Sequence, residues 1–154
     1  IMYRSGAEQK IRKYLIDNNF VDCIIQLSDN LFFGTTIATC IMVLKKSKTD
    51  NSVLFIDASS ECEKITNNNK LTEENILNII NLYSGRKDIE YRTKCVPNKS
   101  ISDNKYNLTV SSYVEKKDES CIIDIVALNR EIESIVLKEN KLRSEIQKII
   151  DSLE

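Results

Sequence analysis

The sequence predicts an α/β fold followed by a long C-terminal helix, and three observations support this prediction. Three apolar segments, at residues 21–27, 36–44 and 52–57, have the length and composition of strands. Amphipathic segments before and after them have the spacing of helices that cover a sheet. Residues 121–154 then repeat apolar side chains three and four positions apart, as in a coiled coil.

The first helix is expected in SGAEQKIRKYLIDNN, residues 5–19. Ser5 and Glu8 have the spacing of a capping box, in which each side chain bonds the backbone N–H of the other residue. Four apolar residues fall on one helical face, and we expect this face to be buried: Ala7, Ile11, Tyr14 and Leu15. The strand VDCIIQL follows, and its unbroken apolar run is typical of a strand covered on both faces.

The second helix is expected in LTEENILNIINLYSG, residues 71–85. Thr72 is its predicted N-cap and Gly85 its end, with Leu71 and Ile76 in the positions of a hydrophobic staple. Its predicted buried stripe consists of Ile76, Ile79, Ile80 and Tyr83. Residues 86–120 are polar and contain Pro97, so we expect an irregular connection with one patterned piece, YNLTVSSYV.

The C-terminal segment carries about four heptads of a narrow apolar seam. Its members are Ile125, Leu128, Ile132, Ile135, Leu142, Ile146, Ile149 and Leu153, with Glu139 in the one interrupted position. A narrow seam between charged faces favours pairing with a partner helix. The alternative is a terminal helix that packs along its own domain.

Composition excludes several kinds of chemistry. The chain has no histidine, so it cannot contain a Ser-His or Cys-His catalytic pair, and its three glycines stand too far apart for a phosphate-binding loop. Five widely spaced cysteines lack the spacing of a zinc site, so no metal site is expected. Their odd number favours reduced thiols and a cytoplasmic location.

Charged residues give two weaker signals. The net charge is −1, but a modestly basic middle precedes an acidic tail. The basic side chains could contact phosphates or form a solvated surface, and the pattern favours the solvated surface: Arg86, Lys87, Arg92, Lys94, Lys99 and Lys105, and likewise Lys45, Lys46 and Lys48. Asp57, at the end of a strand, could bind a ribose or cap its own loop, and the loop cap is the favoured reading.

Two adjacent phenylalanines, Phe32 and Phe33, lie in the turn between the first two strands, just before Gly34. One reading is that an aromatic side chain fills the core. The other is that the pair offers a stacking platform for a planar ligand, such as a nucleobase extruded from DNA.

The order of these pieces resembles one known family. RSGAEQKIRKYLIDNNFVDCIIQLSDNLFFGTTIATCIMVLKK, VLFIDAS, NKYNLTVSSYVE and IDIVALNREIESI together closely resemble the C-terminal portion of the modification (M) subunit of type I restriction–modification systems. Such subunits are adenine-specific (N6) DNA methyltransferases that use S-adenosylmethionine. The resemblance covers essentially the whole chain, and NLFFGT and YNLTVSSYV are its most specific parts.

The resemblance implies a role for the aromatic pair. In this class, the hairpin after the catalytic motif helps to form the pocket for the extruded adenine. Phe32 is the first candidate to contact the base and Phe33 the expected core plug, while Asn30 and Thr35 would shape the turn. The sequence departs from the usual family pattern near this turn, at Ser28, Asp29, Thr36 and Ala38.

The resemblance also implies missing parts and partners. The cofactor loop and the Asn-Pro-Pro-aromatic motif are absent, so the chain is expected to be an inactive fragment of a longer enzyme. It would comprise the end of the catalytic domain (1–85), a connecting segment (86–120) and an assembly helix (121–154). The implied partners are the specificity (S) subunit, the restriction (R) subunit and DNA, and the isolated fragment should dimerise. The alternative is a non-enzymatic α/β interaction module that dimerises through its coiled coil.

Overall fold

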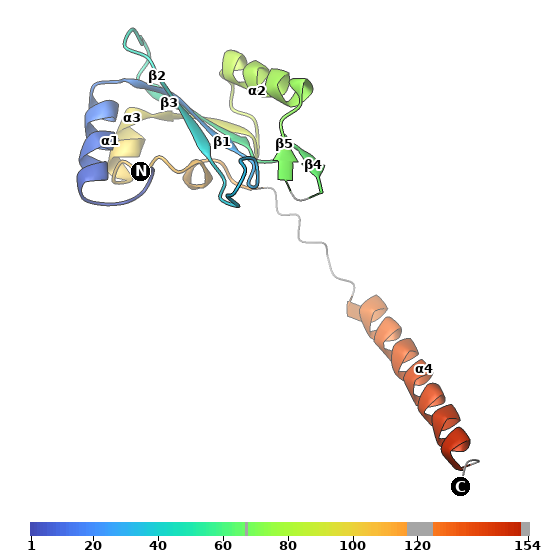
Figure 1. The fold of residues 1–154 in the computed structure, drawn as a ribbon. Helices are drawn as coiled ribbons and strands as arrows, with labels where there is room; N and C mark the ends of the chain where they lie inside the picture. Colours follow the sequence, from blue (N-terminus) through green and yellow to red (C-terminus); the bar gives the residue numbers. More distant parts are fainter. Residues whose placement is uncertain (67, 117–124, 152–154) are drawn as a thin grey trace. The chain divides into compact units, whose positions relative to one another are not determined.

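The computed structural model describes residues 1–66, 68–116 and 125–151, in two compact units, Ile1–Lys117 and Asp118–Glu154. The first unit contains a mixed four-stranded sheet of order β2-β1-β3-β6 (Figure 1). Its elements are α1 (Ala7–Asp17), β1 (Val21–Leu27), β2 (Cys40–Leu44), β3 (Ser52–Ala58), β4 (Glu63–Ile65), β5 (Asn68–Lys70), α2 (Glu73–Gly85), β6 (Thr93–Pro97), α3 (Asn98–Asp103) and the 3₁₀ turn η1 (Val110–Ser112). The second unit contains α4 (Ile125–Asp151).

The sheet confirms two strands as expected and corrects two other predictions. β1 runs parallel to β3 and antiparallel to β2, so the first two strands form a hairpin. The second strand begins at Cys40 rather than at Thr36, because residues 28–39 form the connecting loop. The segment 86–120 was wrongly expected to be irregular, since β6 within it pairs antiparallel with β3. Pro97 ends this edge strand, where proline's missing N–H is tolerated.

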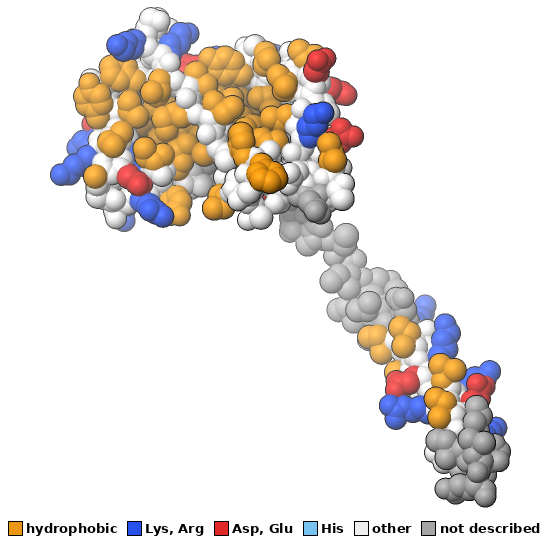
Figure 2. All heavy atoms as spheres, viewed as in Figure 1, with side chains coloured by type: hydrophobic (Ala, Val, Ile, Leu, Met, Phe, Trp, Pro, Cys, Tyr) orange, Lys and Arg blue, Asp and Glu red, His pale blue; other side chains and the backbone are white. Residues whose placement is uncertain are grey.

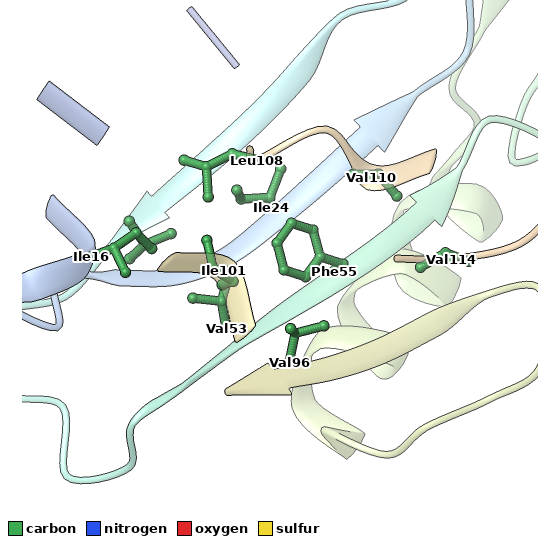
Figure 3. Close-up of a cluster of buried hydrophobic side chains, with 10 residues drawn as sticks. Ile16, Ile24, Val53, Phe55, Val96, Ile101, Leu108, Val110 and Val114 are labelled. Carbon is green, nitrogen blue, oxygen red and sulfur yellow. The ribbon is translucent and has the colours of Figure 1, made fainter. Parts of the chain in front are cut away.

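Side chains that alternate along β1 and β3 form two hydrophobic clusters, one on each face of the sheet. On one face, Phe55 packs with side chains from α1, α3 and the 108–114 segment (Figure 3). The Phe55 and Tyr113 ring centroids are 4.4 Å apart. On the other face, Leu54 and Ile56 pack with Ile79 of α2. Figure 1 shows α1 and α3 on the face opposite α2, so the unit has three layers.

Helix α1 forms as expected, but its start and its buried face were wrongly predicted. Its N-cap is Gly6, with φ 83°, and no side chain caps it, so Ser5 and Glu8 form no capping box. Ile11 and Tyr14 are 49% and 61% exposed, whereas Arg12 is buried. The reason is that the Arg12 guanidinium donates hydrogen bonds of 2.6 Å to the carbonyl oxygens of Tyr106 and Ile1. These bonds rotate the polar residue inward.

Helix α2 begins as expected and buries less than expected. Thr72 caps it, and Asn75 completes a capping box. After Gly85, Arg86 adopts a left-handed conformation with φ 43° and ends the helix. The buried stripe is narrower than predicted, because Ile79 is buried while Ile76 and Ile80 are 44% and 50% exposed.

A buried carboxylate joins α2 to the sheet. Asp22 of β1 is 1% exposed, and it accepts hydrogen bonds from the Tyr83 hydroxyl at 2.7 Å and from Arg86 at 2.9 Å. Burial alone would raise the pKa of Asp22, but the two hydrogen bonds and the Arg86 charge outweigh burial and lower it. Arg86 also lies 3.3 Å from Asp50. This part of the basic stretch therefore stabilises the fold.

The first unit exposes a large apolar surface, and Figure 2 shows hydrophobic side chains gathered over one face. Its exposed hydrophobic side chains include Ile11, Tyr14, Ile41, Leu44, Ile76, Leu77 and Ile80. These side chains belong to α1, to the edge strand β2 and to α2, so they are spread over more than one layer of the unit. Within the described residues, no helix is long and apolar enough to cross a membrane.

Helix α4 occupies the segment for which a coiled-coil-like helix was expected. Four described members of its seam are more than half exposed: Ile132, Ile135, Leu142 and Ile146. Glu139, in the interrupted position, pairs with Arg143 one turn later at 2.8 Å. The structure does not describe the side chains of the other four apolar seam residues, Ile125, Leu128, Ile149 and Leu153. Pairing through this seam stays a prediction.

Candidate functional site

The loop between β1 and β2, residues 28–39, has a firmly held stem. The backbone N–H of Leu27 donates to the Thr39 carbonyl at 2.8 Å, which closes the loop at its base. Ser28 is 1% exposed, and Leu31 packs against the cluster on the α2 face of the sheet. Asn30, between them, has φ 48°, a left-handed conformation that asparagine tolerates better than most residues.

This stem places both phenylalanines outside the core. Phe32 is 54% exposed and Phe33 is 98% exposed. The expectation that Phe33 fills the core was therefore wrong. Leu31 takes that place, because the left-handed turn at Asn30 directs Leu31 inward and leaves the next two side chains at the surface.

The tip of the loop is shaped by short-range hydrogen bonds. The Thr35 N–H donates to the Phe32 carbonyl at 3.3 Å, and the Thr35 hydroxyl oxygen accepts from the Ile37 N–H at 3.2 Å. Gly34, with φ 77°, adopts the left-handed conformation that glycine allows without strain. The tip thus turns immediately after the aromatic pair.

The loop offers aromatic faces on a fixed support. An exposed phenylalanine ring can stack on any planar ligand, and base–aromatic stacking contributes about 1–3 kcal/mol per base. The chemistry available at the loop is therefore binding and orientation of a planar group. The surface has two pockets of about 360 and 500 Å³ elsewhere. Neither pocket is lined by the residues predicted to hold the base, which are Asn30, Phe32, Phe33 and Thr35.

Three other candidate residues have structural partners. The Asp57 carboxylate accepts from the Ser59 N–H at 2.9 Å, so it caps its own turn, as the sequence favoured. Arg92 pairs with buried Glu61 at 2.5 Å, and Lys94 pairs with Asp88 at 2.9 Å. Among the residues that the structure describes, no cluster of histidine, cysteine or acidic side chains could hold a metal ion.

In the part of the chain that the structure describes, neither of the two candidate features provides a site for S-adenosylmethionine. Its three glycines are separated along the sequence, so they form no cradle for the cofactor. Asp57, the carboxylate best placed at a strand end to bind a ribose, is engaged in its own turn.

One neighbour of the loop was not expected from the sequence, namely the two-stranded ribbon β4–β5. Asn69 of β5 donates hydrogen bonds to Asp29 and Asn30, forty and thirty-nine positions earlier in the chain. The segment TNNNK around Asn69 has no periodicity, and contacts over such separations leave no local signal in a single sequence.

Comparison with known proteins identifies the family. The model of the family described as N-6 DNA Methylase matches residues 1–121. The chain belongs to this family.

Within the family, its relatives are subunits of one kind of enzyme. It is 43% identical over 154 residues to the type I restriction enzyme MpnII methylase subunit of Mycoplasma pneumoniae, covering 99% of this chain and 28% of the relative. It is 36% identical over 151 residues to the type I restriction enzyme MjaVII methylase subunit of Methanocaldococcus jannaschii. This match covers 94% of this chain and 26% of the relative. The resemblance to type I modification subunits is thereby confirmed.

A solved structure supports the same conclusion. The crystal structure of the type I restriction–modification methyltransferase subunit from Streptococcus thermophilus matches with a TM-score of 0.73 and 39% identity. The match covers 75% of this chain and 25% of that chain. The chain thus spans about a quarter of the length of the proteins it matches.

Proposed function

We propose that this chain is the C-terminal part of a type I modification subunit that methylates adenine N6 in DNA. Its relatives are named methylase subunits of type I restriction enzymes, and its family is that of the N-6 DNA methylases. A DNA substrate and the free thiols of Cys23, Cys40, Cys62 and Cys95 favour a cytoplasmic location.

One observation carries the proposal: the 28–39 loop holds two exposed phenylalanines on a buried stem. An enzyme that modifies a base must extrude it from the duplex and hold it in a pocket, usually between aromatic or apolar side chains. Phe32 and Phe33 would form one wall of that pocket, with Asn30 and Thr35 fixing the turn. Phe33 is the more exposed, so it is a candidate equal to Phe32.

The chain's contribution to the reaction is positioning. S-adenosylmethionine supplies the methyl group in this family, and the residues that bind it would lie in another part of the complete protein, together with the Asn-Pro-Pro-aromatic motif. The loop would hold the adenine so that its exocyclic amino group stays aligned for attack. Holding two reactants in line is the main requirement of such a transfer. Alone, the chain is expected to be inactive.

The test uses the complete modification subunit with its specificity subunit. Phe32→Ala and Phe33→Ala are compared with Ile37→Ala, which removes another exposed apolar side chain from the same loop. Loss of about 1–3 kcal/mol of stacking corresponds to a roughly 5- to 150-fold lower kcat/KM in at least one phenylalanine variant. A 2-aminopurine placed at the target adenine should also fluoresce less in that variant, because the extruded base is held less often.

Ile37→Ala should leave both readouts unchanged. Wild-type methylation and wild-type fluorescence in both phenylalanine variants would refute the proposed role. In that case the 28–39 loop would have no part in holding the base, and this chain would contribute to the enzyme through assembly alone.

We propose further that α4 is an assembly helix that packs against the specificity subunit, within a complex that also includes the restriction subunit and DNA. The exposed seam residues Ile132, Ile135, Leu142 and Ile146 support this role, because an apolar stripe on a helix is stable in water only when covered. Without the partner, the seam should pair with a second copy of the chain.

Ile135→Lys should abolish both self-association in light scattering and co-purification with the specificity subunit. Leu137→Lys is the matched control, because Leu137 is 70% exposed on the same helix but lies outside the seam. Equal effects of the two variants would refute pairing through the seam.

A further inference from the structure

The ribbon β4–β5 connects β3 to α2, and the proposed function gives it no role. Its second strand is fixed at its C-terminal end. Leu71 packs against the hydrophobic cluster on the α2 face, and Thr72 forms the capping box that begins α2. Residue 69 therefore lies two positions before a firmly anchored point of the fold.

Asn69 holds the stem of the 28–39 loop through three hydrogen bonds. Its backbone N–H donates to the Asn30 carbonyl at 2.9 Å. Its side-chain Nδ2 donates to the Asp29 carbonyl at 2.8 Å and to the Asp29 carboxylate at 3.1 Å. One residue thus fixes the two positions that precede Leu31 and the aromatic pair.

These bonds bear on the least favourable backbone conformation in the stem. Asn30 has φ 48°, a left-handed conformation that asparagine tolerates but that is less favourable than the usual one and is held in place by its surroundings. Asn69 binds the carbonyl of Asn30 and both acceptors of Asp29. Without the side-chain bonds, this turn can relax, and the side chains that follow it then move.

We propose that Asn69 is a positioning residue for the target base. It acts through the loop, by holding Asp29 and Asn30 in the conformation that packs Leu31 against the core and presents Phe32 and Phe33 to the base. This inference rests on the proposed function of the loop. A displacement of about 1 Å in a group that orients a substrate can lower a rate up to roughly 100-fold.

Two variants remove the side-chain bonds, one by truncation and one with almost no change in size. Asn69→Ala removes the Nδ2 donor. Asn69→Asp replaces Nδ2 with a carboxylate oxygen, which would be repelled by the carbonyl and carboxylate oxygens of Asp29. The matched control is Asn68→Ala. Asn68 is an exposed neighbour in the same strand, and its side chain points to the opposite side of the ribbon because strand residues alternate.

The first measurement is amide hydrogen exchange of the 154-residue chain. Asn69→Ala and Asn69→Asp should raise the exchange rate of peptides covering residues 28–36, with the larger increase in Asn69→Asp. Peptides from β1 and β3 should keep wild-type rates, and Asn68→Ala should match wild type throughout. Unchanged exchange in residues 28–36 of both Asn69 variants would overturn the proposal.

The second measurement is methylation by the complete modification subunit with its specificity subunit. Asn69→Ala should lower kcat between about 10- and 100-fold, with the affinities for S-adenosylmethionine and for DNA unchanged. A general loss of folding would lower both affinities as well. Adding Phe33→Ala or Phe32→Ala to Asn69→Ala should cost less than it does in the wild type, because the two residues act through one contact.

The outcomes separate this inference from the function on which it rests. Loss of methylation in a phenylalanine variant with wild-type kcat in Asn69→Ala would overturn the role of Asn69 and leave the proposed function intact. Wild-type methylation in both phenylalanine variants would overturn the proposed function, and with it this inference. Increased exchange together with lowered kcat supports both.

Discussion

Replacing Tyr83 by phenylalanine should destabilise the first unit through one identifiable hydrogen bond. The Tyr83 hydroxyl donates to the Asp22 carboxylate at 2.7 Å, and Asp22 is 1% exposed. A hydrogen bond to a charged group contributes about 1.5–3 kcal/mol, and no water can replace the lost donor at so buried an oxygen. Arg86 still pairs with Asp22 in the variant, so the carboxylate stays charged.

For a unit of this size, that loss lowers Tm by roughly 5–15 °C at neutral pH. The measurement is thermal unfolding followed by circular dichroism, with Tyr14→Phe as control because Tyr14 is 61% exposed. The control should change Tm by less than about 2 °C, as substitutions at exposed positions usually do.

The pH dependence tests the mechanism. The pKa of Asp22 is lowered in the folded state, so the stability that it contributes is fully present above its usual pKa of 3.8. This contribution is lost as the pH falls through the lower, folded-state value. The difference in Tm between wild type and Tyr83→Phe should therefore narrow at acidic pH. A difference that is as large at acidic pH as at pH 7, or absent at both, would refute this reasoning.

Three further substitutions test other parts of the fold. Phe55→Ala removes the centre of one cluster and should lower the free energy of unfolding by about 3–5 kcal/mol in urea titrations; a loss below about 1 kcal/mol would contradict its central position. Ser28→Ala should leave stability unchanged or raise it by about 1 kcal/mol in the same titration, because the buried Ser28 hydroxyl has no hydrogen-bond partner among the described residues; a clear loss would reveal one. Burial of Glu61 would raise its pKa, but the hydrogen bonds from Arg92 and from neighbouring side-chain amides outweigh burial and lower it. The free energy of unfolding should therefore fall as the pH drops through the lowered pKa of Glu61. Glu61→Gln should remove this part of the acid dependence of stability.

The sequence predicted the centre of the sheet well, for a physical reason. β1 and β3 are buried on both faces, so most positions in them are apolar, and such runs are visible without any structure. The start of α2 was also predictable, because a cap such as Thr72 acts on residues three positions away.

Elements defined by distant partners were not predictable. β6 reads TKCVP, and only its pairing with β3 makes this mixed segment a strand. The buried face of α1 depends on two carbonyl groups that accept from Arg12, one of them at residue 106. At the candidate site, the aromatic pair was visible in the sequence, but the exposure of Phe33 and the brace from Asn69 depend on the turn at Asn30 and on chain segments that meet only after folding.

The 108–114 segment has a consequence for how the chain is made. Phe55 of β3 packs against Val110 and Val114, which follow it by more than fifty positions, so the part of this face around Phe55 stays uncovered until the late segment arrives. On the ribosome, α1 and the strands β1, β2 and β3 emerge before this segment, so Phe55 must wait with one side uncovered. A chaperone that recognises exposed aliphatic side chains would have its best opportunity in this interval. Chains that end between residues 97 and 108 lack Val110 and Val114, so Phe55 would keep this uncovered side permanently.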